Sequence, residues 1–175
     1  MIPFPNKKYQ IIYADPPWPI RWTRNINKNM PLRELDYSTM PISEICNFPI
    51  REIADDDCVL FMWTTNEFLP EALGIIRNWR FRYEKLLTWC KNNGMGGHPR
   101  NATEHIIIAK RGNPKPLRGK HDKALMNWMC LPVKQKHSQK PNEFRKIIEK
   151  LYGGNKIELF ARQKTEGWDV WGNEV

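Results

Sequence analysis

Residues 15–18 read Asp-Pro-Pro-Trp and directly follow the apolar run YQIIYA at residues 9–14. Two consecutive prolines neither continue a strand nor lie inside a helix, so a strand formed by the apolar run must end at them. Its end then carries the carboxylate of Asp15, a rigid backbone without N–H groups and the indole of Trp18. Because α/β sheets bind ligands beyond the carboxyl ends of their strands, this spacing predicts a binding site rather than a plain turn.

The sequence lacks the motifs of several other catalytic classes. No Walker loop or GxGxxG follows the first apolar run, and no GxSxG, HExxH or PCxxC occurs, which argues against phosphate-loop, hydrolase and zinc-deaminase sites. The cysteines stand apart, without a CxxC pair or a histidine at ligand spacing: Cys46, Cys58, Cys90 and Cys130. We therefore expect buried free thiols and no metal site.

Apolar runs that alternate with amphipathic segments indicate strands and helices in turn. Nearly continuous apolar character is typical of strands buried on both faces of a sheet. The runs expected to form strands cover residues 9–14, 57–64, 83–91, 104–111 and 156–161. A glycine-rich loop is expected at residues 92–101. The alternation predicts a single domain over residues 1–175 with an α/β fold, built on a doubly wound sheet.

Three helices are expected between these strands. The first covers residues 43–54, with Ser43 as its N-cap and a break at Pro49. The second covers residues 66–79. The third covers residues 141–152, because a proline suits the first turn of a helix and the two glycines that follow suit its end.

The chain is strongly basic, with 28 Lys and Arg residues against 19 Asp and Glu residues and a net charge of +9. This balance favours nucleic acid as a partner, because cations that face phosphates gain affinity by releasing counterions. A well-solvated basic surface is the alternative. Cations gather in polar, Pro/Gly/Asn-rich segments at residues 21–33 and 110–123, and we expect these segments to form flaps that face the substrate.

Asp-Pro-Pro-Trp at residues 15–18 resembles the catalytic motif of amino-methyltransferases that use S-adenosylmethionine. Its form resembles that of the MT-A70 family, named after the 70-kDa catalytic subunit of mRNA adenosine-N6 methyltransferase. Further segments resemble the family in the same order: residues 36–40, 60–66, 103–114, 137–141, 156–162 and 167–174. The resemblance implies a Rossmann-like methyltransferase fold with a mixed sheet and a permuted motif order, closest in its compactness to the bacterial and phage branch.

The residue types of the motif suit methyl transfer to an exocyclic amine. The amine of adenine is a poor nucleophile, because its lone pair is delocalised into the ring. The Asp15 carboxylate and the Pro16 carbonyl can each accept one of its N–H groups, which aims the nitrogen lone pair at the donor methyl. Pro17 makes the backbone rigid, and Trp18 can stack on the purine or form a wall of the pocket.

The resemblance also implies contacts to the cofactor. Lys140 would bind the cofactor carboxylate beside the start of a helix, itself a favourable place for an anion; a solvated residue at a helix start is the alternative. Glu158 and Arg162 would flank the ribose, and a glutamate inside an apolar strand needs a partner. The other expected contacts are neighbours of the motif or belong to the last segments: Ala14, Asp15, Lys164, Asn173 and Glu174.

Substrate contacts are expected from the parts of the chain around the motif. Tyr37 occupies the place of a family aromatic near the target base. A second group belongs to the glycine-rich loop, a candidate lid, or to the first basic segment: Lys91, Asn92, His98, Arg21 and Arg24. Glu104 opens an expected strand, where it can bond the target base or pair with Arg100.

Together these features predict methylation of adenine N6 in DNA, with S-adenosylmethionine as the cofactor. The alternatives are adenine N6 in RNA, cytosine N4, and a nucleic-acid-binding module without catalysis. No apolar run of 18 residues and no signal-peptide core occurs, so we expect a cytoplasmic protein that does not enter a membrane. A homodimer or a protein partner would supply the recognition surface for which 175 residues offer little room.

Overall fold

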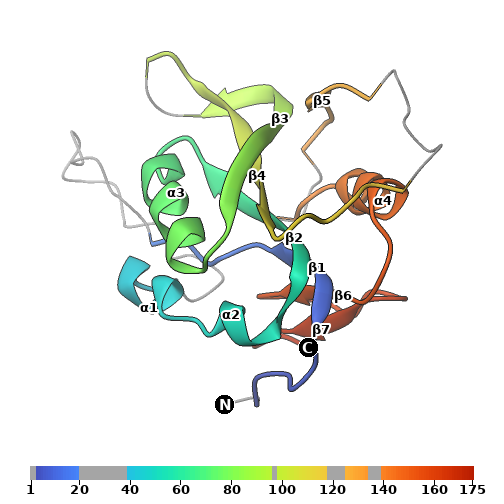
Figure 1. The fold of residues 1–175 in the computed structure, drawn as a ribbon. Helices are drawn as coiled ribbons and strands as arrows, with labels where there is room; N and C mark the ends of the chain where they lie inside the picture. Colours follow the sequence, from blue (N-terminus) through green and yellow to red (C-terminus); the bar gives the residue numbers. More distant parts are fainter. Residues whose placement is uncertain (1–2, 20–38, 96–97, 118–124, 134–138) are drawn as a thin grey trace.

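The computed structural model describes residues 3–19, 39–95, 98–117, 125–133 and 139–175. At its centre lies a seven-stranded sheet with the strand order β5-β3-β4-β2-β1-β6-β7 (Figure 1). The strands are β1 (Tyr9–Ala14), β2 (Ala54–Thr65), β3 (Arg82–Met95), β4 (Asn101–Arg111), β5 (Trp128–Cys130), β6 (Lys156–Leu159) and β7 (Asp169–Trp171). Parallel and antiparallel pairs both occur, so the predicted mixed α/β sheet is confirmed.

Helices cover both faces of the sheet (Figure 1). On one face lie α1 (Ile42–Cys46), α2 (Ile50–Ile53) and α3 (Leu69–Asn78), and on the other lies α4 (Asn142–Leu151). This arrangement confirms the doubly wound class. Within the described ranges, no helix is both long enough and apolar enough to span a bilayer.

Strand β1 contributes to both cores, because successive side chains of a strand point to opposite faces. Ile12 and Ala14 pack in the core beneath α1, α2 and α3. Ile11 and Tyr13 pack in the core beneath α4, together with Phe144 of that helix. Burial on both faces explains why the run at residues 9–14 is almost continuously apolar.

The direction of the strands places the candidate residues at one end of the sheet. β1 runs parallel to its two neighbours β2 and β6, and β6 runs parallel to β7. The chain passes from β1 to β2 on one side and later reaches β6 on the other, so the carboxyl ends of β1 and β6 form a topological switch point. Asp15 follows β1 there. Because β4 is antiparallel to β2, with Glu104 opposite Thr65, the start of β4 lies at this switch-point end too.

Several expected elements need correction. The first expected helix is indeed broken at Pro49, but the N-cap of α1 is Pro41 rather than Ser43. Strand β3 continues to Met95, so much of the expected loop at residues 92–101 is strand. Strands β5 and β7 went unpredicted, because three residues carry no readable periodicity.

The second basic segment, residues 110–123, begins at the end of the sheet opposite Asp15. Arg111 closes β4, and its Nη1 donates to the carbonyl of Arg51 at 3.0 Å. Further on, the N–H of Leu117 donates to the carbonyl of Leu151 at 2.9 Å, at the end of α4. The described part of this segment therefore does not face the switch-point end, and the expectation of a substrate-facing flap is wrong for it.

The four cysteines carry free thiols, as their spacing predicted. Cys58 is buried in β2, where burial raises the pKa of its thiol to about 12. Cys130 in β5 is exposed. The expectation that all four are buried is therefore wrong.

Candidate active site

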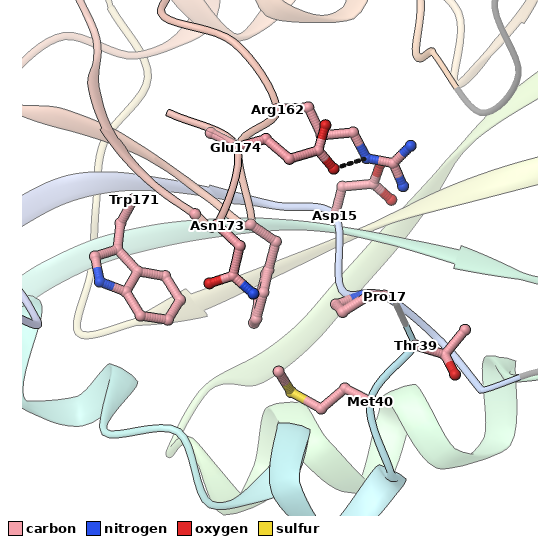
Figure 2. A pocket seen from close by; sticks show the side chains of 11 residues that line it. Asp15, Pro17, Thr39, Met40, Arg162, Trp171, Asn173 and Glu174 are labelled. Atoms are coloured by element: carbon pink, nitrogen blue, oxygen red, sulfur yellow. Dashed lines mark ion pairs between the residues drawn. The ribbon is translucent and has the colours of Figure 1, made fainter. Parts of the chain in front are cut away.

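A pocket opens at the switch-point end, between segments that follow β1, β6 and β7 (Figure 2). It holds about 560 Å³ of space, part of which is open solvent at its mouth. The residues that line it are Asp15, Pro17, Thr39, Met40, Phe160, Ala161, Arg162, Trp171, Gly172, Asn173 and Glu174. The fold thus brings the Asp-Pro-Pro-Trp segment together with the last two segments of the chain.

The backbone is unusually shaped where it forms the pocket wall. Phe160 has a φ of +60°, a left-handed conformation that is rare for a bulky residue and that clusters at functional sites. The next residue, Ala161, donates its N–H to the carbonyl of Trp171 at 3.0 Å. A Cβ atom at Gly172 would lie 2.2 Å from the oxygen of Ala161, so only glycine permits this close approach.

The Asp-Pro-Pro-Trp segment is held by backbone hydrogen bonds on both sides. The N–H of Asp15 points to the carbonyl of Leu159 in β6 at 3.4 Å, and the carbonyl of Pro17 accepts the N–H of Met40 at 2.8 Å. The carbonyl of Pro16 accepts the N–H of Trp18 at 2.8 Å. Because a carbonyl oxygen has two lone pairs, that of Pro16 keeps one for a ligand donor.

The indole of Trp18 is engaged by the protein. Its ring stacks on Phe68 with the centroids 5.5 Å apart and the planes 10° from parallel. Its Nε1 donates to the carbonyl of Trp63 at 3.0 Å. Of the two roles considered for Trp18, these contacts favour a wall that fixes the motif over a platform that waits for a purine.

Asp15 and three other charged side chains form a network. The Nζ of Lys140 lies 3.0 Å from Oδ2 of Asp15 and 3.4 Å from Oε2 of Glu104. Lys91 pairs with the other carboxylate oxygen of Glu104. The ammonium of Lys140 also lies 5.3 Å from the ring centroid of Trp63, which is within cation–π range. Charges therefore alternate in sign from Asp15 across the sheet to β3.

The network shifts the pKa of Lys140 and the pKa of Glu104 so that both side chains stay charged. Burial by itself would lower the pKa of Lys140, but the attraction of Asp15 and Glu104 outweighs it and raises that pKa. Burial by itself would raise the pKa of Glu104, but Lys140 and Lys91 lower it below its usual range. Glu104 and Lys140 are thus held as ions at neutral pH.

The partners of the substrate candidates differ from those expected. Glu104 pairs with Lys140 and Lys91, and not with Arg100. Lys91 and Asn92 belong to strand β3 instead of a flexible loop. His98 lies exposed in the turn between β3 and β4.

The cofactor candidates separate into those that line the pocket and those that do not. Arg162, Asn173 and Glu174 line it, and the Nε of Arg162 lies 3.8 Å from Oε1 of Glu174 (Figure 2). Ala14 is fully buried beneath the pocket, in β1. Lys164 is exposed and is not part of the lining.

Glu158 has a different partner from the one proposed for it. Its carboxylate is buried and receives two hydrogen bonds from the guanidinium of Arg145 in α4. It does not line the pocket. The partner that a glutamate in an apolar strand requires is therefore Arg145, and this placement argues against a contact of Glu158 with the ribose.

Three expected substrate residues, Tyr37, Arg21 and Arg24, lie outside the described residues. The structure adds Thr65 to the candidates: its Oγ1 is buried and has no hydrogen-bond partner among the described residues. Thr65 ends β2 opposite Glu104. Its position within the similar segment 60–66 was the one signal that could have found it.

The donors and acceptors at the pocket suit an amino-acid-like ligand with charges of both signs. The carboxylate of Asp15 can hold a cationic group, and Lys140 beside it can hold a carboxylate. An ammonium has three N–H donors, so Lys140 keeps one beyond its contacts to Asp15 and Glu104. The amide of Asn173 and the ions Arg162 and Glu174 can bond hydroxyls or ring nitrogens. Among the described residues, no cluster of His, Cys, Asp and Glu is arranged to hold a metal ion.

Comparison with known proteins identifies relatives over almost the whole chain. A sequence model of the MT-A70 family matches residues 9–174. Type II methyltransferase M.MunI of Mycoplasma sp is 31% identical over 98% of this chain and 79% of its own length. N6-methyladenosine RNA methyltransferase MTA1 of Cryphonectria parasitica is 32% identical over 95% of this chain.

N(6)-adenine-specific methyltransferase METTL4 of Mus musculus is 27% identical over 97% of this chain. The chain spans most of M.MunI, but only 52% of MTA1 and 38% of METTL4. The similarity to these two longer proteins is therefore confined to one part of each.

Proposed function

The chain belongs to the MT-A70 family, and on that premise we propose that it transfers a methyl group from S-adenosylmethionine to the N6 amino group of adenine in DNA. Bound in the pocket, the cofactor would supply an electrophilic methyl on a sulfonium. The protein has to bind it and to orient the amine. An intracellular site of action, where nucleic acid is present, follows from this proposal.

The position of Asp15 is the observation that carries the proposal. It combines a carboxylate at the end of a central strand, a lining position in the pocket and an adjacent backbone carbonyl with a free lone pair. The carboxylate of Asp15 and the carbonyl of Pro16 would accept the two N–H groups of the amine, so that its lone pair faces the methyl. Pro17 lacks an N–H that could compete for these acceptors.

The pocket, together with Lys140, which contacts Asp15 without lining the pocket itself, offers separate contacts for the two ends of the cofactor. Lys140 would bind the carboxylate of its methionine part, with Asp15 on the cationic side. Arg162, Asn173 and Glu174 would bind its ribose and adenine. Gly172 lets the chain after β7 approach Ala161 closely at this end of the pocket, because a side chain there would collide with the Ala161 backbone.

The choice of DNA rests on the similarity to M.MunI, a type II methyltransferase by its name, because this similarity extends over 79% of that relative. RNA is the second candidate substrate. MTA1, whose name describes an RNA methyltransferase, has a similar sequence identity to this chain, 32%. The basic character of the chain suits either polyanion.

The deciding experiment is a transfer assay with labelled S-adenosylmethionine. Single- and double-stranded DNA and RNA of matched sequence are offered in parallel, and the products are digested to nucleosides. We expect N6-methyldeoxyadenosine. N6-methyladenosine from RNA alone would move the substrate to RNA, and N4-methyldeoxycytidine would change the target base. Binding of cofactor without transfer would indicate a missing protein partner or a non-catalytic module, and absence of cofactor binding would refute the proposal.

Substitution of Asp15 tests the mechanism. Asp15→Ala should abolish transfer, because the amine loses one acceptor, while the dissociation constant of S-adenosylmethionine changes by no more than about tenfold, or roughly 1.4 kcal/mol. Asp56→Ala is the matched control, since Asp56 is fully exposed at the opposite end of the sheet. Near-normal turnover by Asp15→Ala would contradict the proposed role.

A further inference from the structure

We infer that Arg145 and Glu158 form a positioning pair that holds the strand carrying Asp15, and that neither residue binds the cofactor. This inference rests on the proposed function, because it assigns a task to two residues beneath the proposed pocket. The pair joins α4 to β6, where Glu158 stands in register with Tyr13, two residues before Asp15.

The pair is buried and its geometry is bidentate. Arg145 is 9% exposed and Glu158 is 6% exposed. The Nε of Arg145 donates to Oε2 of Glu158 at 3.0 Å, and Nη2 donates to Oε1 at 2.5 Å. The remaining Nη1 donates to Oδ1 of Asn142 at 2.7 Å, in the first turn of α4. All three nitrogens of the guanidinium and both oxygens of the carboxylate are thus used within the protein.

The pair contacts the strand of the motif through Tyr13. The guanidinium carbon of Arg145 lies 5.3 Å from the ring centroid of Tyr13. The hydroxyl of Tyr13 accepts the Nε1 proton of Trp63 at 2.6 Å. Tyr13 stands two residues before Asp15 in β1, and it pairs in register with Glu158 in β6. Arg145 therefore contacts both β1 and β6 from the side of α4, shortly before the carboxyl ends of the two strands at the pocket.

Trp63 extends the same contacts to the other residues of the proposed site. Its ring lies beneath Lys140 at 5.3 Å, and its carbonyl accepts the indole proton of Trp18. Tyr13 and Trp63 thus lie between the ion pair and the Asp15–Lys140 contact. A change at Arg145 and Glu158 would reach the site as a shift of β1, without the loss of any group that touches a ligand.

The two charges also have to be balanced. Arg145 interacts electrostatically with Asp15 as well as with Glu158. Loss of Glu158 would leave Arg145 as an unpaired buried cation near a pocket proposed to bind a cationic sulfonium. Charge repulsion would then weaken cofactor binding, although Glu158 itself does not contact the cofactor. Loss of both charges together would remove this repulsion. The double substitution therefore separates a balancing role from a direct one.

The test compares Arg145→Met, Glu158→Met and the double variant with the wild-type protein. Lys146→Met is the matched control, because Lys146 is an exposed cation on the solvent side of the same helix. Titration calorimetry with S-adenosylmethionine gives the dissociation constant, and the transfer assay gives kcat and the KM for the cofactor. Denaturant unfolding of all four variants shows whether each one folds.

We expect Glu158→Met to weaken cofactor binding about tenfold and the double variant to bind within about threefold of the wild type. The kcat of the double variant should fall at least about tenfold, because Asp15 is less well positioned. A double variant that binds as weakly as Glu158→Met would overturn the inference, since Glu158 would then contact the cofactor. A wild-type kcat in the double variant would overturn it as well.

Two further outcomes are distinguishable. If the single variants do not fold, the double variant alone decides between the two roles by its dissociation constant and its kcat. If the wild-type protein does not bind S-adenosylmethionine, the proposed function fails, and the unfolding free energies then test the pair by themselves. Strong coupling between the two substitutions would support the pair, and additive effects would overturn it.

Discussion

Asp15 is surrounded by charges that keep it in place before any ligand arrives. Lys140 binds it directly, and Glu104 and Lys91 continue the alternation of charge. A lone buried lysine would lose its proton readily, but here two carboxylates stabilise its charged form. The network therefore presents a cation and an anion side by side, which is what a zwitterionic ligand requires.

Removal of the Glu104 charge should destabilise the fold of the ligand-free protein. Glu104→Gln leaves Lys140 and Lys91 as neighbouring cations with fewer partners, and at pH 7 we expect a loss on the order of 2 kcal/mol in the free energy of unfolding. The pKa of Glu104 is lowered in the folded state, so its contribution is complete above the unfolded pKa of about 4.3 and declines as the pH falls below it.

Urea unfolding of the wild type and Glu104→Gln from pH 7 down to about pH 3 measures this effect. The difference between the two proteins should shrink as the pH falls through the acidic range. Glu84→Gln is the control, because Glu84 pairs with Lys110 near the opposite end of the sheet and is a third exposed, so its loss should cost less than about 1 kcal/mol. A constant difference across this range would contradict the prediction.

Strands β3 and β4 and the segment after β2 are joined by His105. Its Nδ1 lies 3.0 Å from Oγ1 of Thr88 in β3, and its Nε2 lies 2.9 Å from Oδ1 of Asn66, the residue after β2. Asn66 in turn donates to Thr103 through its amide nitrogen, so its oxygen must face the histidine. Nε2 therefore carries the proton, and Nδ1 accepts the hydroxyl proton of Thr88. Two residues beyond Asn66, Phe68 stacks on Trp18.

This connection should depend on pH. Burial lowers the pKa of His105, and the nearby Glu104 only partly opposes this effect. Because the folded pKa lies below the unfolded value of about 6.5, the unfolded chain binds more protons just below pH 6.5, and stability falls as the pH decreases through this range. At pH 8, His105→Gln should lose about 1–2 kcal/mol, from its two hydrogen bonds.

The measurement is the unfolding free energy of wild type and His105→Gln between about pH 8 and pH 5. The variant should lose the part of the pH dependence that begins near pH 6.5. His98→Gln serves as the control, because His98 is exposed in the turn between β3 and β4. If His105→Gln keeps the slope of the wild type, the lowering of the His105 pKa in the folded protein is contradicted.

On the scale of the whole molecule, the net charge of +9 should govern the encounter with nucleic acid. If the protein contacts about four phosphates, a rise in salt from about 50 to about 200 mM should reduce its affinity for nucleic acid roughly 100-fold, because each contact releases counterions. Fluorescence anisotropy with a labelled oligonucleotide at several salt concentrations measures the slope. A slope near zero would contradict the electrostatic interpretation.

Two sets of variants locate the cations responsible. The double variant Arg21→Gln/Arg24→Gln, in the first basic segment, should reduce the slope of log affinity against log salt by about two, the contribution of about two phosphate contacts. Lys115→Gln removes one charge from the described part of the second segment, which lies away from the switch-point end, and should leave the slope nearly unchanged. An equal effect per charge in both segments would favour a diffuse basic surface.

The local features of the site follow from the sequence by itself. Pro16 and Pro17 end β1, since proline cannot continue a central strand, and burial on both faces makes that strand apolar, so both were predictable from residue types. The order of the similar segments also predicted the family and the mixed α/β sheet. The end of β1 and its apolar character depend on stereochemistry and on burial, which act over a few neighbouring residues, whereas the family and the mixed sheet were predicted from the resemblance.

The tertiary structure alone decided which charges meet. Glu104 could have paired with Arg100, its neighbour along the chain, but the pairing of β3 with β4 places it beside Lys91, and the segment before α4 brings Lys140 to it. Glu158 required a partner, and the packing of α4 on β6 supplies Arg145. Strands β5 and β7 form only because longer strands offer them an edge. Long-range pairing is set by the arrangement of the whole sheet, and no local pattern encodes it.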